Sequence, residues 1–418
     1  MNLESQPLSL RMNFTWTFAG NLIYAACQWV TLMLLAKLTD AVMLGQFAMG
    51  LAISAPVYML ANLSLRNALV TDVQHRYPFG VYLGLRLITV PSAVLLVAGV
   101  ALAGGYGSDT VLVVLAVALA KALESMSLLF HGFLQRQERM DRVGKSLMLK
   151  GLMSPIGMGL LLGLTGEVLY GTLAMAAGWG LILLAYDIPG VSRLLSGGAA
   201  PQDSLRPGLG AGNAGRLFLT ALPLGLTFML AALNTNIPRY FFSEHDLGIF
   251  AAVASLPVLG TTVILSLGQA SIARLARYFA AGDGAAFRRL LLRLIGLATL
   301  LGVAGLLLAL VAGRQILRLL FTEEIAGHTR LLVLLVIAAI VEFNAAILGV
   351  AVTATRAFSH LLVAYAFIAA AALALSFVLI PALGLTGAAW ALFGTYLIIC
   401  LAMAILLAMI WHRKTRTS

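Results

Sequence analysis

Four polar side chains interrupt an otherwise apolar stretch of the chain. If the stretch is helical, all four fall within an arc of about 80°. They are Lys121, Glu124, His131 and Gln135. Ionisable groups inside a membrane are costly and usually mark a path for a substrate or an ion. We therefore expect Lys121 and Glu124 to line a polar cavity; the alternative is a self-neutralising pair with a purely structural role.

A second polar stripe runs along the first apolar segment. Its six members also share an arc of about 80° on a helix. They are Asn13, Thr17, Asn21, Tyr24, Gln28 and Thr31. Hydroxyl and amide groups cost free energy in hydrocarbon unless they face protein or water. The stripe favours a water-filled cavity over hydrogen bonds between helices, and Asn21, Tyr24 and Gln28 are its candidate lining residues.

Two further charged residues occupy positions that suit binding. Glu342 has no charged neighbour within a turn of its apolar segment. It is therefore a silent protonated group, the partner of a distant residue, or a site for a coupling ion. Arg239 follows the break at Pro238. It is either an anchor at the outer surface or an anion contact at the mouth of a cavity.

The elements that must position these residues are apolar helices. Hydrophobic residues make up 61% of the 418 residues and charged residues 10%, whereas a soluble domain carries about 25% charged residues. Runs of roughly 20 apolar residues, each long enough to cross a bilayer, recur from Asn13 to Trp411. The sequence predicts an all-α, polytopic membrane protein with about twelve spans. Their predicted limits are 13–36, 41–64, 83–104, 110–133, 147–165, 167–188, 216–237, 247–270, 291–312, 330–353, 360–380 and 386–411.

The basic residues predict the orientation of the spans. With the N-terminus in the cytoplasm, 21 of the 27 Lys and Arg residues fall on the cytoplasmic side and five on the outside. Short loops rich in Lys and Arg stay in the cytoplasm, so both termini are predicted there. Anionic lipid head groups account for the net charge of +11 without a nucleic-acid partner.

A polar interruption divides the spans into two sets of about six. It runs from Ser192 to Gly215, and its Gly, Pro and Ser content predicts a flexible connector. We expect an N-terminal six-helix bundle over residues 1–190, a cytoplasmic linker over 191–215 and a C-terminal six-helix bundle over 216–418.

Two short motifs recur at corresponding places in the two halves. Leu162–Gly166 and Leu383–Gly387 both read LGLTG, each just before the last span of its half. Leu44–Ala48 is echoed by Leu247–Ala251 at the start of the second span of each half. The repetition predicts an ancient duplication into parallel repeats related by a pseudo-two-fold axis, with a substrate site between them.

Other function classes lack their motifs in this chain. There is no CxxC pair, His-rich cluster, Walker loop or dinucleotide-binding GxGxxG in a soluble βα unit. We therefore expect no metal, nucleotide or other cofactor. An enzyme that polymerises or ligates sugars outside the membrane needs a sizeable external loop for its acids and bases. The longest predicted external loop runs only from Arg314 to His328, so a transporter is favoured over an enzyme.

Five short motifs resemble one known family. They are Gln135 to Asp141 (QRQERMD), Asn236 to Tyr240 (NIPRY), Arg66 to Asp72, Lys121 to Ser125 and Gly387 to Ala389. The first two are the more specific. Together they resemble the polysaccharide transporter family, the oligosaccharide flippases, over essentially the whole chain. That family belongs to the multidrug/oligosaccharidyl-lipid/polysaccharide exporter superfamily, which also holds lipid II flippases and multidrug extruders.

The resemblance implies a V-shaped pair of six-helix bundles in the bacterial plasma (inner) membrane. Such a protein exports undecaprenyl-pyrophosphate-linked oligosaccharide by alternating access. It is expected to be a monomer that works beside the polymerase and glycosyltransferases of a polysaccharide pathway. A hydroxyl-rich sugar suits a wet cavity, and its pyrophosphate needs cations, for which Lys121, Arg66 and Arg11 are candidates. His131, Gln135 and Arg239 complete the expected substrate contacts.

The main alternative is a cation-coupled multidrug antiporter of the same superfamily. The resemblance implies that such proteins bind the coupling cation through acidic residues of the N-terminal bundle. Here the first span has no carboxylate, and Glu124 has Lys121 as a partner. A membrane-embedded polysaccharide polymerase or ligase is a more distant alternative.

Overall fold

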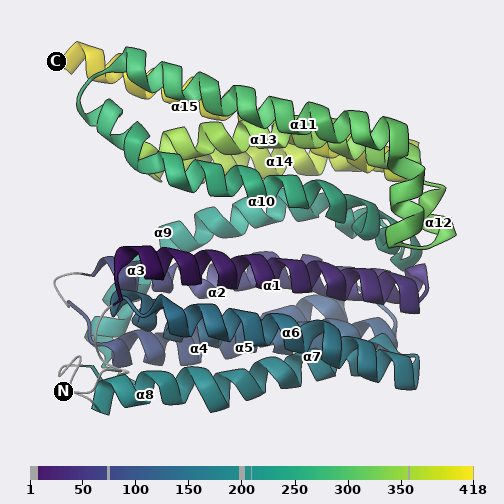
Figure 1. The fold of residues 1–418 in the computed structure, drawn as a ribbon, viewed down its shortest axis with the longest axis horizontal. Helices are drawn as coiled ribbons and strands as arrows, with labels where there is room; N and C mark the ends of the chain where they lie inside the picture. Colours follow the sequence, from purple (N-terminus) through teal and green to yellow (C-terminus); the bar gives the residue numbers. More distant parts are fainter. Residues whose placement is uncertain (1–7, 73–75, 197–202, 209, 356–357, 418) are drawn as a thin grey trace. The chain divides into compact units, whose positions relative to one another are not determined.

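The computed structural model describes residues 8–72, 76–196, 203–208, 210–355 and 358–417. Throughout these residues the regular structure is helical (Figure 1). Within them, twelve helical segments are long and apolar enough to cross a membrane. The predicted all-α membrane fold class and the predicted number of spans are therefore confirmed.

The helices fall into two compact units, Met1–Ala232 and Leu233–Ser418. The first unit holds α1 (Leu10–Leu38), α2 (Ala41–Asn62), α3 (Leu65–Thr71), α4 (Phe79–Ala103), α5 (Ser108–Arg136), α6 (Met140–Thr165), α7 (Val168–Ile182), the π-helical turn η2 (Leu183–Asp187), α8 (Ile188–Ser196) and most of α9 (Ala211–Asn236). The second holds the 3-10 turn η3 (Ile237–Phe241), α10 (Glu244–Ala280), α11 (Gly284–Leu320), α12 (Glu323–Ala326), α13 (Thr329–Ala354), α14 (Phe358–Leu383) and α15 (Leu385–Thr417). The division of the chain at a linker over 191–215 stays a prediction.

The second span is broken near its end. Leu63 and Ser64, between α2 and α3, have left-handed backbone conformations with φ of 46° and 51°. Residues with a side chain seldom adopt this conformation, so the surrounding packing must hold it. Leu63 is only 1% exposed and belongs to the core. The break starts α3, the short helix that carries Arg66.

Two glycines bring α1 and α6 into backbone contact. A Cβ atom on Gly20 would lie 2.6 Å from the Cα of Gly144, and one on Gly144 would lie 2.6 Å from the carbonyl oxygen of Trp16. Neither glycine can gain a side chain unless the helices separate. Small residues commonly permit such close approach between membrane helices. The contact places the polar stripe of α1 beside α6.

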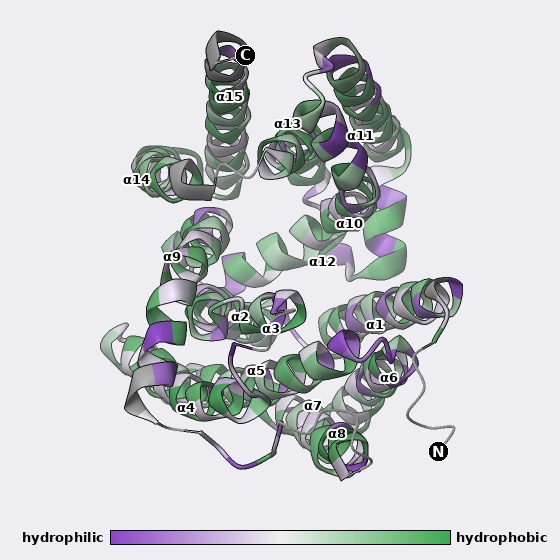
Figure 2. Ribbon diagram, turned by 90° about the vertical axis from the view of Figure 1, so that its left-hand side faces the viewer, coloured by the Kyte–Doolittle hydropathy of each residue, from purple (hydrophilic) through white to green (hydrophobic). Residues whose placement is uncertain are grey.

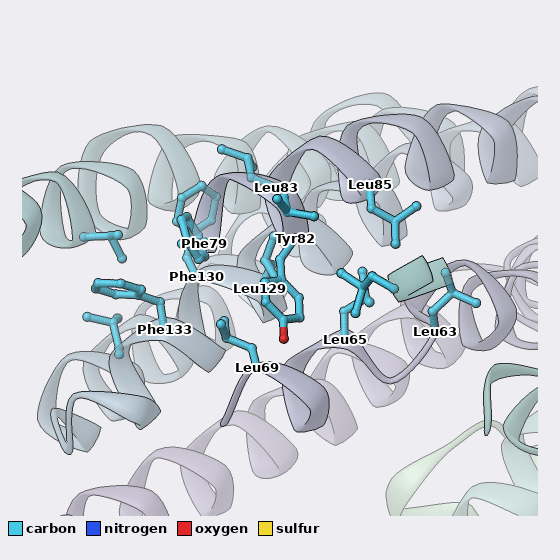
Figure 3. Close-up of a cluster of buried hydrophobic side chains, with 14 of the residues drawn as sticks. Leu63, Leu65, Leu69, Phe79, Tyr82, Leu83, Leu85, Leu129, Phe130 and Phe133 are labelled. Atoms are coloured by element: carbon cyan, nitrogen blue, oxygen red, sulfur yellow. The ribbon is translucent and has the colours of Figure 1, made fainter. Parts of the chain in front are cut away.

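A buried core cluster of the N-terminal unit takes most of its side chains from α3, α4 and α5 (Figure 3). The Phe79 ring packs against the rings of Phe130 and Phe133, with centroids 5.8 and 5.1 Å apart. Leu65 and Leu69 of α3 are fully buried in the same cluster. This packing fixes the end of α5 that carries His131 and Gln135.

Part of the predicted connector packs against the N-terminal unit. Asp203 forms an ion pair with Arg136 at the end of α5. Its other carboxylate oxygen accepts a hydrogen bond from the backbone N–H of Phe79, at the start of α4. Because one carboxylate binds both a cation and a helix N-terminus, residues 203–208 are docked where the sequence predicts a flexible connector. Residues 197–202 and 209 of the connector lie outside the described ones.

Apolar side chains cover much of the outside of both units. Hydrophobic residues predominate along the helices in Figure 2. Leu95 and Leu164 of the first unit are each 73% exposed, and Val311 of the second is 81% exposed. Exposed apolar surface on this scale is unfavourable in water and suits contact with lipid. The chain is a multi-pass membrane protein.

Candidate functional site

The N-terminal unit contains a cavity of about 300 Å³ among α1, α2, α5 and α7. Its polar lining residues are Tyr24, Gln28, Thr31, Lys121 and Glu124. Apolar side chains such as Phe47 and Met175 and the ring of Trp179 complete the wall. The structure therefore brings together residues from the two polar stripes that the sequence singles out. We call this space the N-terminal cavity.

An ion pair forms the polar centre of the N-terminal cavity. Lys121 Nζ lies 2.8 Å from Glu124 Oε2, and the Tyr24 hydroxyl donates a 2.8 Å hydrogen bond to Glu124 Oε1. Both carboxylate oxygens of Glu124 are therefore occupied. The Lys121 and Glu124 side chains remain 28% and 26% exposed, so the ammonium group has room for a further acceptor. Its nitrogen also lies 5.8 Å from the centroid of the Trp179 ring, within cation–π range.

The wall beside the ion pair is held by a second set of hydrogen bonds. Gln28 Nε2 donates to Ser154 Oγ at 3.1 Å, which joins α1 to α6. Trp179 Nε1 donates to the same oxygen at 2.9 Å. These bonds fix the amide of Gln28 and the ring of Trp179 in place, as a preformed binding surface requires.

Most of the remaining α1 stripe bonds within its own helix, although Asn13 Oδ1 accepts from the backbone N–H of Met140 in α6 at 3.1 Å. The Asn21 amide donates to the carbonyl of Thr17 at 2.8 Å, and Thr31 Oγ1 donates to the carbonyl of Cys27 at 2.8 Å. Asn21 is exposed, but it is not among the residues that line the N-terminal cavity.

His131 lies in a separate, fully buried polar network. Its Nε2 atom is 3.0 Å from Ser146 Oγ and 3.5 Å from Asp187 Oδ1. Lys150 Nζ binds the other oxygen of Asp187 at 2.6 Å. Asp187 ends the π-helical turn η2, an irregularity that often accompanies functional sites. His131 is 1% exposed and does not line the N-terminal cavity.

Two basic residues near the ends of predicted spans are buried. The charge count assigns Arg86 and Lys150 to the cytoplasmic side, and the structure buries both side chains, in α4 and α6, at 1% and 2% exposure. The Arg86 guanidinium donates to Asn62 Oδ1 and to Ser125 Oγ. A buried cation must be paired or hydrogen-bonded. The sequence feature that could have indicated a buried Lys150 is its spacing of four residues from both Ser146 and Ser154, which places the three on one face of a helix.

Arg66 and Gln135 bind each other. Arg66 Nε and Nη2 both donate to Gln135 Oε1, at 3.1 and 2.9 Å. The pair joins α3 to α5 beside Gly132, where an added Cβ would lie 3.1 Å from Arg66 Cγ. Neither residue lines the N-terminal cavity.

The C-terminal unit has its own polar cavity of about 170 Å³, which we call the C-terminal cavity. Arg239 of η3, Glu342 of α13 and Tyr396 of α15 line it together. Arg239 Nη1 donates to Asn236 Oδ1 at 3.0 Å, while the buried Nε atom has no hydrogen-bond partner. Glu342 Oε1 accepts a long bond of 3.4 Å from Thr261. The structure thus brings together two residues that lie 103 positions apart in the sequence.

Comparisons with known proteins agree with the resemblance noted in the sequence. No model of a protein family matches the chain. The capsular polysaccharide biosynthesis protein CapF of Staphylococcus aureus is 23% identical over 383 residues, covering 90% of this chain and 94% of CapF.

Solved structures establish the fold. An inward-facing multidrug resistance MATE family transporter has a TM-score of 0.73 and 13% identity, covering 96% of this chain and 98% of the transporter. The lipid II flippase MurJ, in an inward closed conformation, also has a TM-score of 0.73, with 10% identity over 94% of this chain and 87% of MurJ. The chain therefore has the fold shared by these two proteins. One of them is a transporter and the other a flippase, and neither is an enzyme.

Proposed function

We propose that the protein is a flippase that moves lipid-linked oligosaccharide from the cytoplasmic to the outer leaflet by alternating access. The expected carrier lipid is undecaprenyl pyrophosphate. The protein acts in the bacterial plasma membrane with both termini in the cytoplasm, as a monomer beside the polymerase and glycosyltransferases of its pathway.

The N-terminal cavity is the observation that carries this proposal. Membrane-spanning helices supply its wall with the ammonium group of Lys121, the amide of Gln28 and two aromatic side chains, Tyr24 and Trp179. Sugar hydroxyls bind amide and hydroxyl groups, and aromatic faces pack against sugar rings. The phosphate oxygens attract cations, and the polyprenyl tail can stay in lipid. The sequence similarity to CapF supports a polysaccharide pathway, and the similarity of the fold to that of MurJ supports a lipid-linked substrate.

Each candidate residue has a role in this scheme. Gln28 hydrogen-bonds the sugar and the ring of Tyr24 packs against it, with Asn21 at the exposed edge of α1. Lys121 binds phosphate, and Glu124 holds the Lys121 side chain in the cavity. Arg66 contacts phosphate when the substrate enters, and Gln135 and His131 support that end of α5. Arg239 contacts an anion in the C-terminal cavity, where Glu342 binds the coupling ion.

A reconstitution assay tests the function directly. Purified protein is placed in liposomes whose lipid-linked oligosaccharide carries a label that an external reagent removes. We expect the label of the inner leaflet to become accessible at a rate that rises with the amount of protein. Liposomes that contain heat-denatured protein serve as the control. Equal rates in the two preparations would reject the proposal.

A cation-coupled multidrug antiporter is the second candidate, because the MATE transporter matches the fold as well as MurJ does. The same liposomes distinguish the two functions. An antiporter would move an organic cation such as ethidium against an imposed proton or sodium gradient and leave the labelled oligosaccharide where it was. The ion pair of Glu124 with Lys121 argues against a cation site in the N-terminal cavity.

The orientation is tested with reporter fusions. A reporter that works only in the cytoplasm should be active when fused after Ser418 and when inserted in the connector between Ser196 and Gly215. A periplasmic reporter should be inactive at both places. An exported signal at either place would contradict the predicted topology.

A further inference from the structure

The C-terminal unit has a groove larger than either polar cavity. It has a volume of about 680 Å³ and runs along α11 and α15. Leu291 of α11, Leu348 of α13 and Leu407 of α15 form its apolar wall. Ala404 and Ala408 leave the α15 side of the groove open. We call it the C-terminal groove.

An aromatic cluster shapes one end of the groove. The Trp411 ring lies 5.4 Å from the rings of both Phe279 and Phe287, so α10, α11 and α15 meet there. A Cβ atom on Gly284 would lie 2.7 Å from the Trp411 ring. The first residue of α11 must therefore lack a side chain for Trp411 to take this place. Tryptophan is typical of the membrane–water interface.

The same end of the groove is cationic. Arg288 and His412 line it, and both sit at the ends of membrane spans, Gly284–Leu320 and Leu385–His412. Between Leu247 and Leu310 the sequence has five arginines and a single acidic residue, Asp283. That carboxylate caps α11 by accepting from the N–H of Ala286 at 2.9 Å. The rim thus carries an excess of positive charge at the ends of two membrane spans, where lipid head groups are expected.

We propose that the C-terminal groove binds one anionic phospholipid from the surrounding leaflet. Its phosphate lies against Arg288, its head group beside Trp411, and one acyl chain against Leu291, Leu348 and Leu407. Basic pockets between membrane helices bind anionic head groups in this way. The site is separate from both polar cavities and does not depend on the transported substrate.

A second groove in the N-terminal unit shows why charge decides the occupant. It has a volume of about 250 Å³ and is lined by side chains of α2, α4 and α9, such as Leu60, Leu96 and Phe218. None of its lining residues is charged. Such a groove accepts an acyl chain of any lipid. The C-terminal groove instead favours an anionic lipid, whose phosphate is not neutralised by a positive charge in its own head group.

Native mass spectrometry of the purified full-length protein tests the site. The protein is titrated with phosphatidylglycerol or with phosphatidylcholine. We expect one phosphatidylglycerol to bind more tightly than phosphatidylcholine. Replacing Arg288 by Gln should weaken phosphatidylglycerol binding by about fivefold, the contribution of one basic residue near a membrane surface. Arg288 is exposed, so the variant is expected to fold.

Arg289→Gln provides the matched control. Arg289 is the next residue of α11 and is also exposed, but it does not line the groove. Its replacement should change phosphatidylglycerol binding by less than about twofold, the effect expected of a screened charge outside the site. Equal losses in the two variants would show a general charge effect and overturn the proposal.

Filling the groove separates this site from contact with annular lipid. Ala404→Trp places a ring in the groove and should abolish the single tight phosphatidylglycerol site. Ile405→Trp, on the neighbouring exposed position outside the groove, should leave it intact. Undecaprenyl phosphate is titrated in the same way. If it displaces phosphatidylglycerol at lower concentration and is itself weakened by Arg288→Gln, the groove serves the transported lipid and the phospholipid proposal is wrong.

Discussion

The two units each hold a polar cavity lined by a cation, a glutamate and a tyrosine, but they arrange the charges differently. In the N-terminal cavity, Lys121 and Glu124 lie one turn apart on α5 and are joined at 2.8 Å. In the C-terminal cavity, Arg239 lies on η3 and Glu342 on α13. Among the described residues, no ion pair joins these last two.

The difference separates two kinds of site. A pair on one helix keeps its geometry when neighbouring helices move, so Lys121 presents a steady, partly neutralised cation to a ligand. Charges on different elements change their separation when those elements move or when an ion arrives. We infer that the N-terminal cavity contacts the substrate and that the C-terminal cavity responds to the coupling ion.

Replacing Lys121 by Ala is expected to have the largest effect. The substrate phosphate loses a charge-assisted hydrogen bond, worth about 1.5–3 kcal/mol, and export should fall by about tenfold or more. Glycan export is measured in a strain that makes the native glycan, with immunoblotting to confirm insertion. Lys145→Ala is the control, because Lys145 lies against the Trp16 ring, outside the N-terminal cavity.

A double variant distinguishes a binding role from a structural one. Apolar residues often replace a buried ion pair without loss of stability. If the pair only stabilises the bundle, changing both Lys121 and Glu124 to Leu should restore export. We expect the double variant to insert normally and to remain inactive. Normal export by this variant would remove the pair from the substrate site.

Glu342→Gln should uncouple transport from an ion gradient. The amide keeps the size of the side chain and its contact with Thr261 but cannot exchange a proton or hold a cation. In liposomes, we expect transport to lose its response to an imposed proton or sodium gradient. Glu124→Gln should slow transport but keep the gradient response. The reverse pattern would place the coupling site in the N-terminal cavity.

The sequence singles out four lining residues of the N-terminal cavity because they lie on helices with clear periodicity. Tyr24 and Gln28 share a face of one helix, and Lys121 and Glu124 share a face of another. The structure adds that these faces meet, with Tyr24 bound to Glu124 across 100 positions. Twelve spans follow from hydrophobic length alone, which is why their number is confirmed.

The buried ion pair of the N-terminal unit and the C-terminal cavity depend on contacts that no local sequence pattern reveals. Lys150 and Asp187 lie near the ends of predicted spans, where charges usually face water, yet they bind each other in the interior at 2.6 Å. The pairing depends on the π-helical turn that ends at Asp187, and a turn of this kind has no reliable sequence signature. The placement of Arg239 and Glu342 around one cavity likewise depends on how η3 packs against α14 and α15.

Arg66→Lys tests whether the N-terminal unit has a second phosphate contact outside its cavity. Lysine keeps the charge but loses the planar fork that binds Gln135 through two nitrogens. We expect normal insertion and export reduced about threefold, since lysine would lose one of the two hydrogen bonds, worth about 0.5–1.5 kcal/mol, that the fork can make to a phosphate group. Arg193→Lys, at another exposed cation of the N-terminal unit, is the control. Wild-type export by the Arg66 variant would leave Arg66 with a topological role only.

The same small change in both cavities gives the finest test of the comparison. Tyr24→Phe removes one hydrogen bond from Glu124, but Lys121 still holds that carboxylate at 2.8 Å. Tyr396→Phe removes a hydroxyl that interacts with Glu342, whose other contact is the long bond from Thr261. Because one glutamate keeps a charged partner and the other does not, we expect export to fall less than about twofold for Tyr24→Phe and by more for Tyr396→Phe. Thermal unfolding of both purified variants is measured alongside, to separate lost transport from lost stability. A larger loss of export for Tyr24→Phe at equal stability would mean that Glu124, not Glu342, is the carboxylate whose surroundings control transport.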